Sequence, residues 1–257
     1  MYLQQNNLFL VAVVATAIGS WASSVLAASE YVVVAVDPPV DIPPLGKLYK
    51  LGDLLHIDRG STVTLMGDDG SVSAVPGPAD IVVTDSASEA GSTSSESADG
   101  SSRLTAISDL LAKAGGQVQS IGASRGVSAM TPTGLEPWSI PVEDGVTGCI
   151  HDRKLELWRE PGGRAAVSIG YDDQPIVVGL VWDAGSPKLT IPGSVPGEAE
   201  SVVVRIDDQS SRLTLKHLPS GVSPQDHVGL YAWMVGSACL LQASALIREL
   251  ASQGVRR

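Results

Sequence analysis

The stretch AAVSIGYDDQPIVVGLVW, residues 165–182, decides the fold class of this chain. Its two ends, residues 165–169 and 176–182, are rich in the β-branched and apolar side chains that favour strands. Asp172 and Asp173 lie between them, and aspartate is a common turn residue because its carboxylate accepts hydrogen bonds from nearby backbone amides. The stretch therefore predicts two strands joined by a turn.

Further strand-like runs flank this pair, and Gly, Pro or Asp residues separate them. No helical pattern alternates with the runs, which argues against a parallel α/β sheet. Short strands with turn residues between them predict a sandwich-like β module over residues 146–222. The additional runs are LELW at 155–158, KLTI at 188–191, VVVRI at 202–206 and LTLKH at 213–217.

A second group of short strands is expected closer to the N-terminus. Residues 31–36, YVVVAV, have the β-branched content of a strand. Asp68-Asp69-Gly70 has the composition of a hairpin turn and is flanked by short apolar runs on both sides. These features predict a small all-β module over residues 28–84.

The region between the two modules divides into two parts. Residues 85–102, DSASEAGSTSSESADGSS, hold no large apolar side chain and cannot offset the entropy of ordering, so we expect a disordered linker. Residues 103–145 are expected to form a short helix and an irregular connection. The helix is predicted at residues 104–114, before Gly115-Gly116, with one apolar face made of Leu104, Ile107, Leu110 and Leu111.

A long C-terminal helix is predicted over residues 223–253. Ser223 is suited to the N-cap and Pro224 to the first helical position. Residues 228–247 carry no charge and are long enough to cross a bilayer, but Gly, Ser and Gln residues dilute their hydrophobicity. We therefore expect this helix to pack on the sandwich. The predicted fold is mainly β, with two small β modules, a short linker helix and this C-terminal helix.

The N-terminal residues 1–27 have the pattern of a signal peptide. Residues 8–18, LFLVAVVATAI, form an apolar core, and Val25-Leu26-Ala27 end the segment with residues that a signal peptidase accepts. The alternative is a retained membrane anchor, because no Lys or Arg precedes the apolar core and residues 8–28 are uncharged. Cleavage predicts a periplasmic protein, and contact with the membrane is expected only if the leader is retained.

The chain has two cysteines, Cys149 and Cys239. Export into an oxidising compartment allows them to form a disulfide, and a single pair leaves one connectivity. Such a bridge would close a loop of about 90 residues and stabilise the fold by about 4 kcal/mol. The alternative is a pair of buried free thiols.

The net charge of −11 and the pI of about 4.7 argue against a nucleic-acid partner. A nucleic-acid-binding protein neutralises phosphates with clustered Lys and Arg residues, and this chain has no such cluster.

One motif resembles a catalytic element. Gly122-Ala-Ser-Arg-Gly126 matches the G-x-S-x-G pattern of a hydrolase nucleophile elbow, which requires a turn from a strand into a helix. The residues that follow, VSAMTPTG, do not favour a helix. We therefore assign no catalytic residue and do not expect an enzyme. The alternative is an exported serine hydrolase with a dispersed triad and Ser124 as its nucleophile.

No metal ligand and no cofactor-binding residue is assigned. The histidines at 56, 151, 217 and 227 lack the short spacings that place two imidazoles on one metal. Paired aspartates at 68–69, 172–173 and 207–208 are more simply explained as turn residues than as calcium ligands. Of the tryptophans at 138, 158, 182 and 233, those at 158, 182 and 233 are expected mainly in the core, with a sugar-binding or cell-wall-binding surface as the alternative.

The module at residues 28–84 resembles the β domain of FecR-type proteins. The resemblance is carried by Gly52-Asp-Leu-Leu, by Gly60-Ser-Thr-Val-Thr-Leu65 and by the Asp69-Gly-Ser71 turn. FecR-type proteins are periplasmic components of transmembrane signalling, so the resemblance implies a role in the envelope.

The rest of the chain resembles a group of uncharacterised exported proteobacterial proteins. This resemblance implies that the two cysteines pair and that the C-terminal helix is not a membrane span. Together, the two resemblances lead us to expect a non-enzymatic interaction, sensory or scaffold protein whose partner is another envelope protein. The matching elements are Gly122-Ala-Ser-Arg-Gly126, Pro137-Trp138, Cys149, Leu157-Trp158-Arg159, Ala232-Trp233-Met234, Cys239 and Gln242-Ala243.

Overall fold

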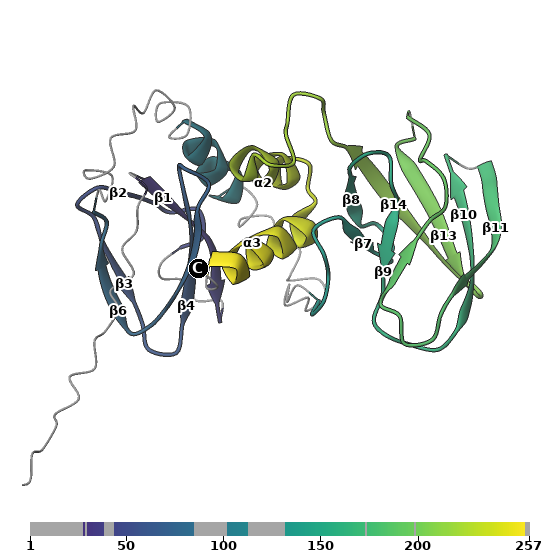
Figure 1. Ribbon diagram of the computed structural model, residues 1–257, viewed down its shortest axis with the longest axis horizontal. Coiled ribbons are helices and arrows are strands. Elements are labelled where there is room, and N and C mark those ends of the chain that lie inside the picture. The colour runs from purple at the N-terminus through teal and green to yellow at the C-terminus, as the bar shows by residue number, and fades with distance from the viewer. Residues whose placement is uncertain are drawn as a thin grey trace, which may run out of the picture.

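The computed structural model describes residues 28, 30–38, 44–84, 102–112, 132–172, 174–197 and 199–254. The expected signal peptide at 1–27 and the G-x-S-x-G motif at 122–126 lie outside these residues. So does the expected linker at 85–102, except for its last residue. The described residues form a mainly β protein with two β modules and a group of helices between them, as Figure 1 shows.

The first module contains six strands in two antiparallel sheets. A four-stranded sheet has the order β2-β1-β4-β5, and β3 pairs with β6. The strands are β1 (Glu30–Asp37), β2 (Leu48–Lys50), β3 (Leu54–Ile57), β4 (Thr62–Gly67), β5 (Val72–Pro76) and β6 (Ala79–Val82).

Strand β1 is apolar from Tyr31 to Val36 because both faces of its sheet are covered. Side chains alternate between the two faces of a strand. Tyr31 and Val33 pack in a cluster with residues of β3, whereas Val32 and Val34 pack against helices. The continuous YVVVAV run that predicted this strand therefore reflects a central position between two layers.

Three helices make up the layer on the second face of this sheet. They are a helix at residues 102–112, α2 (His227–Gly236) and α3 (Leu240–Gly254). Leu104, Ile107 and Leu111 of the first helix are buried, as its predicted apolar face requires. In the described residues no helix is both long and apolar enough to cross a membrane.

The second module is a sandwich of a five-stranded and a three-stranded sheet around one core. The orders are β11-β10-β13-β14-β8 and β12-β9-β7, with parallel pairing of β8 to β14 and of β7 to β9. The strands are β7 (Ser139–Pro141), β8 (Thr147–Ile150), β9 (Glu156–Trp158), β10 (Ala165–Tyr171), β11 (Gln174–Trp182), β12 (Lys188–Thr190), β13 (Ser201–Ile206) and β14 (Gln209–His217).

The sandwich begins earlier in the chain than the sequence predicted. Strand β7 lies inside residues 103–145, where we expected only a helix and an irregular connection. Its three residues are all buried, but a run as short as Ser-Ile-Pro has no period that identifies a strand. Pairing with β9 defines it instead.

The expected single C-terminal helix is two helices. The chain leaves α2 at Ser237, and Ala238 adopts a left-handed conformation with φ of 63° before α3 begins. The N-cap of α2 is Asp226 rather than Ser223.

The packing of these two helices also differs from the expectation. Their buried side chains lie mainly in a cluster with Val32, Met66 and Val72 of the first module. Contact with the sandwich is confined to a smaller area around Cys149, Leu135 and Trp158. The helices therefore join the two modules, and α3 ends beside the first module in Figure 1.

Candidate functional site

The predicted pair of cysteines forms a disulfide. The Cα atoms of Cys149 and Cys239 are 5.9 Å apart, and the S–S distance is 2.09 Å. Cys149 lies on β8 of the sandwich, and Cys239 lies at the break between α2 and α3. The bond therefore connects the sandwich covalently to the helical layer.

Gln242 forms a second connection one turn further along α3. Its side-chain Oε1 accepts a hydrogen bond from the Cys149 amide at 2.6 Å, and its Nε2 donates to the Cys149 carbonyl at 2.9 Å. The same Nε2 donates to the Pro137 carbonyl at 3.0 Å. Strand β8 is the last strand of its sheet, so its outer edge has no neighbouring strand. The Gln242 amide hydrogen-bonds to the backbone of this edge, as a neighbouring strand would.

Arg248 of α3 adds a third contact with the segment that leads into the sandwich. Its guanidinium donates to the carbonyls of Pro132 at 3.3 Å and Leu135 at 3.1 Å. We call the Cys149–Cys239 disulfide, Gln242, Arg248 and the backbone groups they bind the joint. Its polar groups are largely satisfied, as buried polar groups must be.

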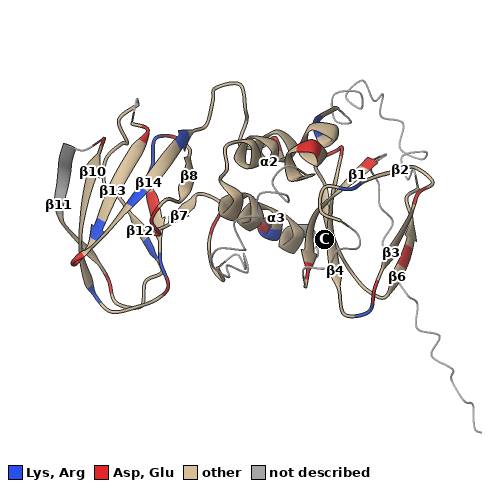
Figure 2. Cartoon of the chain, turned by 180° about the vertical axis from the view of Figure 1, so that it is seen from behind, with Lys and Arg blue, Asp and Glu red and all other residues tan. Residues whose placement is uncertain are grey.

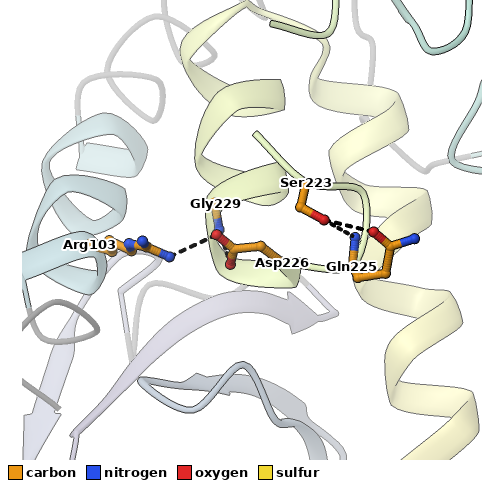
Figure 3. Close-up of polar contacts among 5 residues, drawn as sticks. All are labelled: Arg103, Ser223, Gln225, Asp226 and Gly229. Carbon is orange, nitrogen blue, oxygen red and sulfur yellow. Dashed lines mark hydrogen bonds and ion pairs between the residues drawn. The ribbon is translucent and has the colours of Figure 1, made fainter. Parts of the chain in front are cut away.

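The helical layer is itself fastened at the start of α2, as Figure 3 shows. Asp226 accepts a hydrogen bond from the Gly229 amide at 3.0 Å and forms an ion pair with Arg103 at 2.7 Å. One carboxylate therefore caps α2 and binds the helix at residues 102–112. Ser223 instead accepts a hydrogen bond from the Gln225 amide at 3.2 Å.

The outer face of β3 and β6 combines apolar and charged side chains. Leu54 is opposite Val82, and His56 is opposite Asp80, so these four side chains share one surface, which we call the β3–β6 face. Leu54 is 59% exposed and Val82 is 52% exposed. Leu51, in the turn before β3, is also exposed. Figure 2 shows acidic residues on this two-stranded sheet.

Electrostatics on this face centre on His56. Its Nδ1 is hydrogen-bonded to Asp80, and its Nε2 is 3.4 Å from Asp58. The hydrogen bond to Asp80, followed by the charge of the same carboxylate, raises the pKa of His56 above 6.5.

A small pocket lies on the sandwich beside the joint. It has a volume of about 170 Å³ and is lined by Trp138, His151, Lys154 and Glu156. The rings of Trp138 and His151 are 5.2 Å apart between centroids and tilted by 35°. Trp138 follows Pro137, whose carbonyl binds Gln242, so the joint positions this wall of the pocket.

The other candidate tryptophans have structural roles. Trp158 and Trp182 are buried, and Trp182 donates a hydrogen bond from Nε1 to the Ser186 carbonyl at 2.9 Å. Trp233 is partly buried against the helical cluster. Trp138 is therefore the member of this set that lines the pocket.

The described residues of the paired aspartates lie in turns, as the sequence predicted, and Asp69 accepts a hydrogen bond from the Ser71 amide within its own turn. Asp172 and Asp207 instead accept hydrogen bonds from amides of neighbouring strands, those of Ser201 and Ala166. Within the described residues, no group of three or more His, Cys, Asp or Glu side chains is placed to hold a metal ion.

Sequence reasoning missed Gln242 and Asp226 as structural connections. Gln242 is a single amide in an otherwise apolar stretch and is only 1% exposed. A buried polar residue in such a stretch indicates a specific hydrogen-bond partner, so the isolated glutamine was the signal in the sequence for this connection. The position of Asp226 near the start of the helix was visible, but its partner Arg103 is distant in sequence.

Comparisons with protein-family models, curated proteins and solved structures gave no match to this chain.

Proposed function

We propose that this protein is an exported, non-enzymatic interaction protein of the bacterial envelope, which acts in the periplasm as a sensory or scaffold component. The observation that carries the proposal is the β3–β6 face. Leu54 and Val82 lie side by side there with more than half of each side chain exposed, and Leu51 is exposed nearby. Apolar side chains gathered on one surface are typical of interaction sites.

The partner that fits this face is a protein surface with an apolar centre and flanking Lys or Arg residues. Asp58 and Asp80 lie beside the exposed apolar side chains, and they attract basic groups. A second copy of this chain is a poor occupant because each copy carries a net charge of −11 and would present the same acidic groups.

The joint gives this surface a defined position relative to the sandwich. A disulfide, three hydrogen bonds of Gln242 and two of Arg248 connect the helical layer to the sandwich. Binding to the first module is therefore coupled mechanically to the second, which suits a scaffold or sensory component.

Two features support export. The leader at residues 1–27 has the apolar core and small terminal residues of a signal peptide. Disulfides persist mainly in oxidising compartments, so the Cys149–Cys239 disulfide supports export. The resemblance of the first module to FecR-type β domains, carried by residues 52–71, supports a role in envelope signalling. Gly52, Gly60 and Gly70 of that segment adopt positive φ, as its turns require.

Photo-crosslinking in the periplasm tests the docking face. A photoreactive residue at position 54 should crosslink a partner protein, and the crosslink should weaken at high salt and in a D58N/D80N variant. The matched control is a photoreactive residue at Val181, an exposed apolar position on the sandwich. A crosslinked homodimer, or equal products from positions 54 and 181, would refute this assignment of the face.

N-terminal sequencing tests export separately. The mature protein recovered from the periplasm should begin at or near Ala28. A protein that retains Met1 in the membrane fraction would contradict cleavage.

A further inference from the structure

The pocket beside the joint has the features of a ligand site, and the case for it is independent of the proposed docking face. Its volume of about 170 Å³ is below the range of roughly 300–1,000 Å³ that holds drug-sized ligands. The pocket therefore has room for one small ring.

The aromatic wall of the pocket is held in place. Trp138 packs partly against the helical cluster, and its ring lies 5.2 Å from that of His151. The carbonyl of the preceding residue, Pro137, is bound by Gln242. A fixed indole offers a rigid apolar surface at little entropic cost, and the C–H face of a sugar ring packs well on such a surface.

The charges around the pocket leave one cation without a protein partner. Glu156 is 3.5 Å from Lys188, which is also 2.8 Å from Glu136, so the ion-pair partner of Glu156 is Lys188 and not Lys154. Lys154 also lines the pocket, and in the described part of the chain it forms no ion pair. A bound carboxylate would supply the missing anion.

His151 adds hydrogen-bonding capacity at the same wall. Its Nε2 is 3.2 Å from Asp152 Oδ1, which leaves Nδ1 as the ring nitrogen for a ligand hydroxyl or amide. An aromatic ring, an imidazole and an ammonium-bearing side chain thus line the same small pocket.

We propose that this pocket binds a single pyranose ring that carries a carboxylate, with the ring against Trp138 and the carboxylate at Lys154. Acidic sugars of this class occur in cell-wall glycans, so the site would let an envelope protein contact the wall.

The test compares two sugars that differ by one carboxylate-bearing group. The oxidised ¹⁵N-labelled protein is titrated with N-acetylmuramic acid and with N-acetylglucosamine, and the Trp138 indole N–H signal, assigned with W138F, is followed by NMR. The acidic sugar should shift this signal and bind about fivefold more tightly, which is the effect of one solvent-exposed ion pair.

Two lysine variants make the result specific. Lys154→Gln should abolish the preference for the acidic sugar, and it should leave the fold intact because Lys154 is exposed. Lys216→Gln, at an exposed position on β14, is the matched control and should keep the preference. An unshifted Trp138 signal with millimolar sugar, equal affinity for both sugars, or a preference that survives Lys154→Gln would each overturn the proposal.

Discussion

Replacement of Gln242 by leucine tests whether the joint depends on the three hydrogen bonds of one amide. Leucine has a similar size but cannot bond to the Cys149 amide, the Cys149 carbonyl or the Pro137 carbonyl. Gln242 is 1% exposed, so water does not replace these bonds readily. Each buried group left without a partner costs about 1–3 kcal/mol, and the added apolar burial returns about 1–2 kcal/mol.

For three such groups the expected net loss is therefore about 4–5 kcal/mol of unfolding free energy, within a range of about 1–8 kcal/mol. Urea unfolding of the oxidised protein, followed by tryptophan fluorescence, measures this loss as a lower midpoint with an unchanged m-value.

Gln253→Leu is the matched control, because Gln253 lies on the same helix but is exposed and bonds only to Glu249. This control should change the unfolding free energy by less than about 0.5 kcal/mol. The reasoning would be refuted if Gln242→Leu cost less than about 1 kcal/mol or matched the control. Gln242→Glu provides a second check, since a carboxylate accepts the Cys149 amide bond but cannot donate to either carbonyl.

Three further predictions concern the disulfide, His56 and the break between the C-terminal helices. The denatured, unreduced protein should show no free thiol in a thiol titration, and the C149A/C239A variant should lose about 4 kcal/mol in urea unfolding; two titratable thiols would exclude the bond. The His56 pKa measured by NMR should lie above 6.5 and should return towards 6.5 in D80N. The stabilisation from the His56–Asp80 pair is fully present below about pH 6.5, and it is lost as the pH rises through the higher folded pKa. Ala238→Gly should stabilise the protein by about 0.5–1 kcal/mol because φ at this position is 63°. As the control, Ala232→Gly within α2 should destabilise the protein by about 1 kcal/mol. Thermal unfolding that ranks the two variants in the opposite order would contradict the left-handed turn.

The local patterns of the sequence were sufficient for the class of fold. Residues 165–182 do form two paired strands, because β-branched side chains and the turn at Asp172, where φ is 46°, act over short distances. Leu104, Ile107 and Leu111 face the core for a similar reason, since helical spacing alone places them on one face. The Cys149–Cys239 pairing could also be predicted, because a chain with two cysteines leaves one connectivity.

Features that depend on distant partners required the tertiary structure. Ala238 carries no strong helix-breaking tendency, so the left-handed turn at this position is not evident from the local sequence. Strand β7 is defined by its pairing with β9. Gln242 connects the helices to the sandwich because the outer edge of β8 leaves the Cys149 backbone free to bind its amide.

Most of the local elements could be predicted from the sequence, since strand propensity, helical periodicity and turn chemistry act between near neighbours. The tertiary structure was needed to establish that the C-terminal helices pack mainly on the first module and join it to the sandwich. It also decided that Trp138 reaches a pocket while Trp158 and Trp182 are buried. These outcomes depend on contacts between residues far apart in the chain, and no local pattern encodes which apolar face meets which sheet.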